Sequence, residues 1–363
     1  MIEKKYEIRA LTGIRGIAAT WVVGFHFYTT IALLFPCIDW FLITVFKPGF
    51  LGVDLFFILS GFIIAYNYQD KLHPFRFGAF GEFLYARLAR IYPVHLATLF
   101  ACLALVVGAK ITNMHLNSEA TNWGVWSFFA NIALVQAWTS TLHENWNFPS
   151  WSISCEWLAY LCFPVLAAIS ALRWGRWKLW VSVSLLLGGY LYLNMVKSAL
   201  LHWAFSRILF EFPVGVCLYQ LSVLRKASGK GFRFAAPEIS ALAICAMMVV
   251  CSICNVSNVL IIPFLALLLY SLANIDRGPL RQLLASRVAC YWGRVSYSLY
   301  MTHAVTSMVM VKLLSLATFE GRSLFVRIGV CVVYFGAISL VAMLVYHLIE
   351  EPARRRMRRF AAA

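Results

Sequence analysis

Long apolar segments separated by short polar breaks constrain this chain more than any other feature of its sequence. Hydrophobic residues make up 62% of the chain and charged residues only 13%, whereas soluble domains carry about 25% charged residues. Ten segments are candidates for crossing a bilayer as helices; they are 10–35, 49–68, 93–110, 151–170, 178–196, 203–222, 237–254, 258–274, 290–315 and 324–348. We therefore expect an all-α polytopic membrane protein with about ten transmembrane helices and one domain that fills residues 1–363.

The distribution of basic residues predicts how these segments are oriented. The apolar stretch 123–138 is short and lies between polar runs, so we expect a re-entrant or interfacial helix there rather than an eleventh span. With the N-terminus inside, the cytoplasmic loops hold 22 Lys and Arg residues, and the outer loops hold only Lys47, Lys110, Lys197 and Arg322. Cytoplasmic loops are enriched in Lys and Arg, so both termini are predicted to be cytoplasmic. The net charge of +16 is therefore read as a topology signal, and no nucleic-acid partner is expected.

Two ionisable residues, Arg15 and His26, stand in the first apolar segment. Eleven helical steps of about 100° complete three turns plus about 20°, which puts both side chains on one face, about 16 Å apart along the axis. Ionisable residues at membrane depth cost about 2.5–3.5 kcal/mol each on insertion scales and by default mark a functional site that faces the bundle interior. A snorkelling arginine and a structural histidine are the alternatives for each residue taken alone.

Two carboxylates are predicted to lie at the same membrane depth as His26. Asp54 and Glu156 each stand about five residues inside the outer end of their segments, and His26 is at a similar depth in its own. A carboxylate beside an imidazole fixes its tautomer and raises its basicity, as a general base requires. The pattern predicts a catalytic His26 oriented by Asp54 or Glu156, and a buried structural network is the alternative.

A pair of arginines precedes the third segment on the predicted cytoplasmic side. Arg87 and Arg90 share a helix face at a spacing of three residues, and Arg76 lies upstream. Guanidinium pairs suit bidentate binding of phosphate, although arginines next to a membrane also serve topology and lipid head groups.

Further polar residues occur in two later segments. Arg207 and Glu211 are one turn apart and are expected to pair with each other. Tyr297, Tyr300 and His303 follow at steps of three and form one polar stripe, which we expect to line the same cavity as His26.

Taken together, these residues resemble the acyltransferase-3 family of integral membrane acyltransferases, which includes bacterial O-antigen and exopolysaccharide O-acetylases. The resemblance covers essentially the whole chain and is carried by five groups of residues: Arg15 with His26, Gly52-Val-Asp54-Leu-Phe-Phe with Leu-Ser60-Gly61, Arg87-Leu-Ala-Arg90, Trp151-Ser152 with Glu156, and Tyr297-Ser-Leu-Tyr300 with His303.

The resemblance implies transfer of an acyl group, commonly acetyl, from cytoplasmic acyl-CoA to a sugar hydroxyl at or beyond the membrane. Carried over, His26 is the catalytic base, with Asp54 and Glu156 beside it. Carried over in the same way, Arg87 and Arg90 bind the donor phosphates. From their place toward the cytoplasmic side, Arg76 and Arg15 are expected to join them. The residues that would contact substrate are Trp151, Ser152, Tyr297, Tyr300 and His303. Acetyl-CoA is the expected co-substrate and no metal is expected.

Other partners and the location follow from the same resemblance. The expected acceptor is a polysaccharide or a lipid-linked glycan, the remaining partners are membrane lipids, and the expected location is the inner membrane of a bacterium. Direct attack by the sugar hydroxyl and transfer through an acylated His26 both remain open.

Two other activities compete with this interpretation. A transporter or flippase of an anionic lipid or sugar would use the same charges as a relay, but such folds are commonly built from internal repeats, and none is visible here. A polyprenyl-phosphate glycosyltransferase would need a metal or diphosphate site on acidic loops, whereas the predicted cytoplasmic loops are basic.

Overall fold

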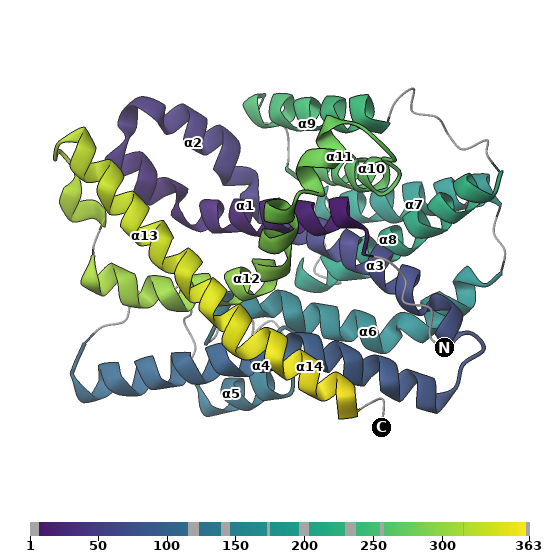
Figure 1. Ribbon diagram of the computed structural model, residues 1–363, viewed down its shortest axis with the longest axis horizontal. Coiled ribbons are helices and arrows are strands. Elements are labelled where there is room, and N and C mark those ends of the chain that lie inside the picture. The colour runs from purple at the N-terminus through teal and green to yellow at the C-terminus, as the bar shows by residue number, and fades with distance from the viewer. Residues whose placement is uncertain are drawn as a thin grey trace. The chain divides into compact units, whose positions relative to one another are not determined.

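The structure is a computed structural model that describes residues 7–114, 123–138, 146–172, 175–195, 203–228, 237–254, 258–314 and 316–360. Within these ranges the chain is helical with short connections and contains no strand, which confirms the all-helical class (Figure 1). Each predicted segment coincides with a helix or overlaps one, but α4 begins at Phe77, well before the predicted 93–110, and the predicted 258–274 begins with the 3₁₀ turn η4. These helices are α1 (Arg9–Leu34), α3 (Leu51–Leu72), α4 (Phe77–Ile111), α6 (Trp151–Ser170), α7 (Arg176–Met195), α8 (Trp203–Ser228), α9 (Pro237–Ile253), α10 (Ile262–Ala273), α12 (Arg287–Leu313) and α13 (Leu324–Val345).

Shorter helices connect these elements. They are α2 (Asp39–Phe46), α5 (Val125–Ile132), α11 (Pro279–Leu284), α14 (Glu351–Phe360), the 3₁₀ turns η1 (Pro36–Ile38), η2 (Lys47–Phe50), η3 (Phe148–Ser150), η4 (Asn258–Ile261) and η5 (Leu316–Phe319), and the π-helical turn η6 (Tyr346–Glu350). The sequence reading did not predict α2. The stretch 123–138 contains α5, whose eight residues are too few to span a bilayer at about 20 residues per crossing.

Six helical stretches among the described residues are long and apolar enough to cross a membrane. They are Arg9–Leu34, Pro36–Leu72, Phe77–Ile111, Phe148–Ser170, Ala204–Ala227 and Leu324–Arg358. Helices α9 and α10 are apolar but shorter, and α12 carries many polar residues along its length. The number ten for the spans therefore stays a prediction, as does the cytoplasmic position of the termini. Of the basic residues in the predicted outer loops, Lys197 lies outside the described residues.

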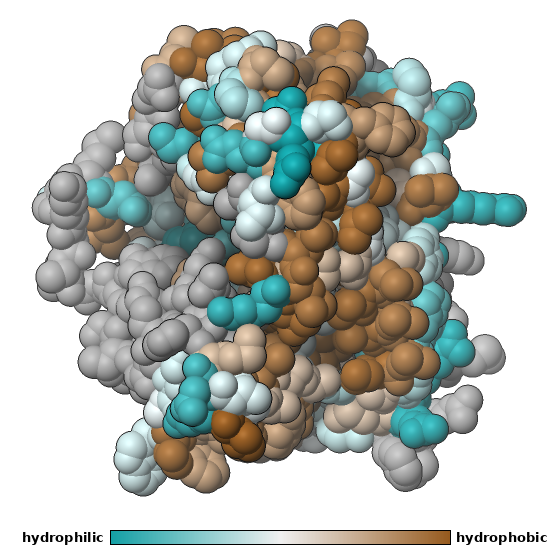
Figure 2. Space-filling model, turned by 90° about the vertical axis from the view of Figure 1, so that its left-hand side faces the viewer, coloured by the Kyte–Doolittle hydropathy of each residue, from teal (hydrophilic) through white to brown (hydrophobic). Residues whose placement is uncertain are grey.

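Exposed apolar side chains support a lipid environment. Only 17% of the apolar window in Leu324–Arg358 is buried, and Phe325 at the start of α13 is 88% exposed. Figure 2 shows hydrophobic side chains gathered over a broad area of the face in view. Apolar surface on this scale is rare on soluble monomers and typical of membrane contact.

The chain groups into two compact units. Unit 1 contains Met1–Trp21, Pro48–Phe83 and Ala159–Arg294, and unit 2 contains Val22–Lys47, Leu84–Leu158 and Val295–Ala363. The single domain expected from the sequence stays a prediction.

In unit 1, glycines allow α3 and α8 to approach closely. A Cβ atom at Gly61 would collide with the backbone carbonyl of Phe212, and one at Gly215 would collide with that of Ile58. Small residues at helix interfaces let backbones pack tightly where lipid supplies no hydrophobic driving force. Apolar side chains from α3, α7, α8 and α10 complete the core, among them Leu55, Leu187, Leu218 and Leu269. This packing fixes the position of the polar residues at the start of α3.

In unit 2, hydrogen bonds fix the segment between α5 and α6. His95 Nε2 of α4 lies 2.8 Å from the carbonyl oxygen of Asn131, and Tyr92 donates to the carbonyl of Ile132 at 2.9 Å. The amide of Asn147 donates to Thr98 Oγ1 at 3.0 Å and to the carbonyl of Met301 at 2.9 Å. Because these groups are buried, each bond satisfies a polar group that would otherwise be costly. The bonds tie η3 and the start of α6 to α4 and α12.

Candidate active site

The residues predicted for the site occur in both units. Helix α1 is continuous over both Arg15 and His26, as the sequence predicted. Unit 1 contains Arg15, Asp54 and Arg76, and unit 2 contains the remaining predicted residues. Each group is therefore described with the residues of its own unit.

Two residues of unit 2 flank the side chain of His26. Its ring centroid lies 5.0 Å from that of His303 on α12 and 6.0 Å from that of Phe148 in η3. His26 is half-buried, whereas His303 is 1% exposed. His303 of the polar stripe on α12 therefore lies beside His26, and the imidazole of His26 is the more accessible of the two. That the whole stripe lines one cavity with His26 stays a prediction.

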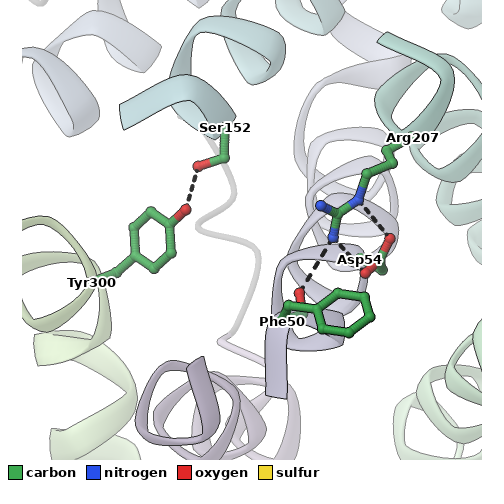
Figure 3. A network of polar contacts seen from close by, with 5 residues as sticks. All are labelled: Phe50, Asp54, Ser152, Arg207 and Tyr300. Carbon is green, nitrogen blue, oxygen red and sulfur yellow. Dashed lines mark hydrogen bonds and ion pairs between the residues drawn. The ribbon is translucent and has the colours of Figure 1, made fainter. Parts of the chain in front are cut away.

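Two hydroxyl groups of unit 2, those of Ser152 on α6 and Tyr300 on α12, lie close together (Figure 3). The oxygens of Ser152 and Tyr300 are 2.9 Å apart. The carbonyl oxygen of Pro149 accepts a hydrogen bond from Tyr300 at 2.9 Å and from Ser152 at 3.2 Å. Since His303 follows Tyr300 by one helical turn and Phe148 precedes Pro149, this hydroxyl pair belongs to the same local cluster as His26.

Two other predicted residues lie on α6. Trp151 is 5% exposed, so its indole is packed rather than presented on a surface. Glu156 lies one turn after Ser152 and is half-buried. Its role in orienting His26 stays a prediction.

The arginine pair of α4 has a carboxylate neighbour that the sequence reading did not identify. Glu350, at the end of η6, is 1% exposed and lies 3.6 Å from Arg90 through Oε1 and Nη1. Ser298 donates to the other oxygen of Glu350 at 2.6 Å. Arg87, one turn before Arg90, is 8% exposed. The hydroxyl of Tyr297 donates to the carbonyl of Ile91, so this tyrosine ties α12 to α4.

In unit 1, Asp54 forms a buried ion pair with Arg207 (Figure 3). Arg207 Nε donates to Oδ1 at 2.9 Å and Nη2 donates to Oδ2 at 2.5 Å, while Nη2 also lies 3.3 Å from the carbonyl oxygen of Phe50. Asp54 is 1% exposed and Arg207 is 9% exposed. This two-point geometry is the strongest form of an arginine–carboxylate contact.

The expected pairing of Arg207 with Glu211 is wrong as the main contact of the guanidinium. Glu211 is fully buried, and neither of its carboxylate oxygens has a hydrogen-bond partner among the described residues. A pair one turn apart on a helix contributes about 0.2–0.5 kcal/mol, whereas both oxygens of Asp54 accept hydrogen bonds along one edge of the guanidinium. Asp54 therefore pairs with Arg207, the residue that the sequence predicts to pair with Glu211.

A cavity of about 280 Å³ opens beside this ion pair. Its walls come from α3, α7, α8 and α10, and its polar lining comprises Asp54, Tyr190, Asn194 and Arg207.

Two of the arginines predicted to bind the donor phosphates belong to unit 1. Arg15 is half-buried on α1, and Arg76 is exposed just before the start of α4.

Replacing Asp54 with asparagine is expected to destabilise the fold by about 3–5 kcal/mol, because it leaves the buried Arg207 without its counter-charge. Thermal unfolding of the purified protein in detergent measures this loss. The double variant Asp54→Leu/Arg207→Met should be closer to wild type than Asp54→Asn alone, since replacing both members of a buried pair is often nearly neutral. Loss of activity in Asp54→Asn at wild-type stability would instead favour the predicted catalytic role of Asp54.

Comparisons with known proteins show the family of the chain. Residues 8–346 match a family model described as an acyltransferase domain, Acyl_transf_3. The acyltransferase MdmB of Streptomyces mycarofaciens is 33% identical over 164 residues, which is 44% of this chain and 39% of that protein. Protein 2 in the picA locus of Rhizobium radiobacter is 36% identical over 112 residues, which is 29% of this chain and 52% of that protein.

The chain thus spans 39% and 52% of the lengths of these two curated relatives. No solved structure matches it significantly. The family model covers nearly the whole chain, from the residue before α1 to the first residue of η6. On this basis the protein belongs to the acyltransferase-3 family, as its sequence motifs predicted.

Proposed function

We propose that the protein is a membrane O-acyltransferase that moves an acyl group from cytoplasmic acyl-CoA to a hydroxyl of a cell-surface polysaccharide or a lipid-linked glycan. Acetyl is the expected group, and the expected location is the inner membrane of a bacterium. The observation that carries this proposal is the half-buried His26 beside His303, in a chain of an acyltransferase family. His303 follows Tyr300 of the Ser152–Tyr300 hydroxyl pair by one helical turn.

In this mechanism His26 acts as the general base. It takes the proton of the acceptor hydroxyl while the hydroxyl oxygen attacks the thioester carbonyl carbon of the donor. The carbon–sulfur bond then breaks, and the proton passes from His26 to the departing thiolate, so that CoA leaves as a thiol. General acid–base catalysis of this kind contributes about 10²–10⁴ in rate.

Four arginines are proposed to hold the donor through its phosphates. They are Arg15, Arg76, Arg87 and Arg90. The guanidinium groups of Arg87 and Arg90 fit this role best, because their spacing on α4 puts them on one face. Glu350 already contacts Arg90, so a donor phosphate would share Arg90 with this carboxylate.

The acceptor is proposed to bind at the hydroxyl pair of Ser152 and Tyr300. These two hydroxyls are held by the Pro149 carbonyl, which leaves lone pairs on their oxygens for a sugar hydroxyl. Trp151 and Tyr297 are proposed to support this region by packing and not by hydrogen bonds to the substrate. The indole of Trp151 is buried, and the hydroxyl of Tyr297 already donates to the carbonyl of Ile91.

Reconstituted protein supplied with radiolabelled acetyl-CoA tests this function. Membranes from host cells that lack the protein serve as the source of acceptor, and released CoA thiol is counted against label in the glycan fraction. We expect thiol release that depends on the acceptor membranes, with matching label in glycan. A folded protein that consumes no acetyl-CoA with any acceptor would overturn the proposal and favour transport.

A further inference from the structure

The hydrogen bond of His303 to its own helix fixes which ring nitrogen carries a proton. Nδ1 of His303 lies 2.7 Å from the backbone carbonyl oxygen of Tyr300. A carbonyl oxygen only accepts hydrogen bonds, so Nδ1 must be the donor. In a neutral imidazole the other nitrogen, Nε2, is then an unprotonated acceptor.

Nε2 of His303 is buried and takes part in no hydrogen bond with the described residues. The residue as a whole is 1% exposed. A buried polar atom left unpaired costs about 1–3 kcal/mol, and such atoms in native proteins call for an explanation, of which a catalytic role is one. The lone pair of Nε2 is therefore available to a group that approaches during the reaction.

The imidazole of His26 is the side chain placed to use that lone pair. The two ring centroids are 5.0 Å apart with an angle of 40° between the ring planes. Two five-membered rings at this separation can place a nitrogen of one within hydrogen-bond distance of a nitrogen of the other. The T-shaped contact with Phe148, at 6.0 Å between centroids, restricts the His26 ring on another side.

We propose that His303 is the positioning residue for His26. This inference rests on the proposed function. As one nitrogen of His26 takes the proton of the acceptor hydroxyl, the N–H at its other nitrogen donates a hydrogen bond to Nε2 of His303. That bond holds His26 in the tautomer whose free nitrogen faces the substrate, and it stabilises the imidazolium until the proton leaves with the CoA sulfur. His303 keeps the same number of protons throughout.

Two matched substitutions separate this role from simple packing. In His303→Asn the side-chain amide nitrogen replaces Nδ1 and keeps the bond to the Tyr300 carbonyl, but no atom remains at the position of Nε2. In His303→Gln the amide reaches the position of Nε2 and its oxygen can accept from His26. Both variants are made in the full chain, reconstituted in lipid nanodiscs, and compared in thermal unfolding.

The readout is the rate at which diethyl pyrocarbonate modifies His26, followed by peptide mass spectrometry at pH 8. This reagent attacks an unprotonated imidazole nitrogen and needs neither acyl-CoA nor acceptor. We expect His303→Asn to slow modification of His26 by about 3–10-fold, the factor that corresponds to one net hydrogen bond, and His303→Gln to stay within about twofold of wild type. With acetyl-CoA as donor, kcat of His303→Asn should fall by a similar factor at unchanged KM.

An unchanged modification rate in folded His303→Asn would overturn the proposal. If that variant does not fold, ¹⁵N NMR of histidine-labelled wild-type protein decides, because the proposal requires a protonated Nδ1 and an unprotonated Nε2 in His303. The opposite tautomer would also overturn it. A protein that shows the expected modification rates but no acyl transfer would instead contradict the proposed function.

Discussion

Replacing His26 with alanine is expected to lower kcat for acyl transfer by about 10²–10⁴, the contribution of a positioned general base. The loss should fall on kcat, because His26 acts on the hydroxyl proton and the donor is proposed to bind through arginines. Steady-state release of CoA thiol from acetyl-CoA gives kcat, and calorimetry gives the affinity for CoA. We expect the dissociation constant of CoA to change by less than about threefold, since removing an interaction made only in the transition state leaves ground-state binding intact.

Thr29 provides the matched control for this substitution. It follows His26 by three residues on α1, and its side chain is exposed. Thr29→Ala therefore tests whether truncating a side chain on this part of the helix alters activity by itself. Thr29→Ala should retain wild-type kcat. Transfer at the normal rate by His26→Ala would refute the central claim.

An acid quench without acceptor separates the two routes of transfer. Direct attack predicts that acetyl-CoA leaves His26 unmodified when no hydroxyl is present. An acetyl group trapped on His26 would show that the histidine is first acylated as a nucleophile. The two routes make the same prediction for His26→Ala, so the quench is needed in addition to the variant.

The helices were predictable because their signal is local. Each predicted apolar segment coincides with a helix or overlaps one, and α1 carries Arg15 and His26 on one continuous helix. In lipid a chain must satisfy its backbone hydrogen bonds within the segment, which leaves the helix as the solution for long apolar runs. Helix α2 was not predicted because Asp39–Phe46 is only eight residues long, too short for a membrane span at about 20 residues per crossing.

The partners of charged residues were not predictable in the same way. Arg207 bonds to Asp54, a residue 153 positions away, whereas the sequence offered Glu211 one turn along the same helix. Glu350 is not among the residues predicted for the site, yet it contacts Arg90 and Ser298. Helical periodicity ranks neighbours on one helix but carries no information on which helices pack together. The close passage of α3 against α8 at Gly61 and Gly215 decides that question here.

The hydroxyl pair at the candidate site shows the same limit. Trp151, Ser152 and Tyr300 were chosen from the resemblance to a family, but the sequence did not indicate that Pro149 supplies the carbonyl that holds both hydroxyls. Asn147, which ties this segment to α4 and α12, gave only a weak signal as a buried amide next to an apolar run. Polar residues at such positions are the best sequence clue to a fixed loop.

Removing the arginine pair is expected to weaken binding of the acyl-CoA donor and to leave the rate of the chemical step nearly unchanged. Arg87→Ala should raise KM for acetyl-CoA by about 10–100-fold with little change in kcat, because a charge-assisted hydrogen bond to phosphate contributes about 1.5–3 kcal/mol. Arg90 needs a compensated variant, since Arg90→Ala alone leaves the buried Glu350 without its cation, at a cost of about 3–5 kcal/mol. The pair Arg90→Ala/Glu350→Gln removes both charges and keeps an amide in the place of the carboxylate.

A donor without nucleotide phosphates isolates the contact itself. Acetyl-pantetheine carries the same thioester as acetyl-CoA but lacks those phosphates, so wild-type protein should prefer acetyl-CoA by the factor that the arginines contribute. Arg87→Ala should lose most of this preference, with kcat/KM for acetyl-pantetheine unchanged. Arg355→Ala on α14 is the control, because it removes one exposed positive charge that is paired with Glu351 and should leave the preference intact. If Arg87→Ala weakens both donors equally, Arg87 supports the fold of α4 and the donor phosphates bind elsewhere.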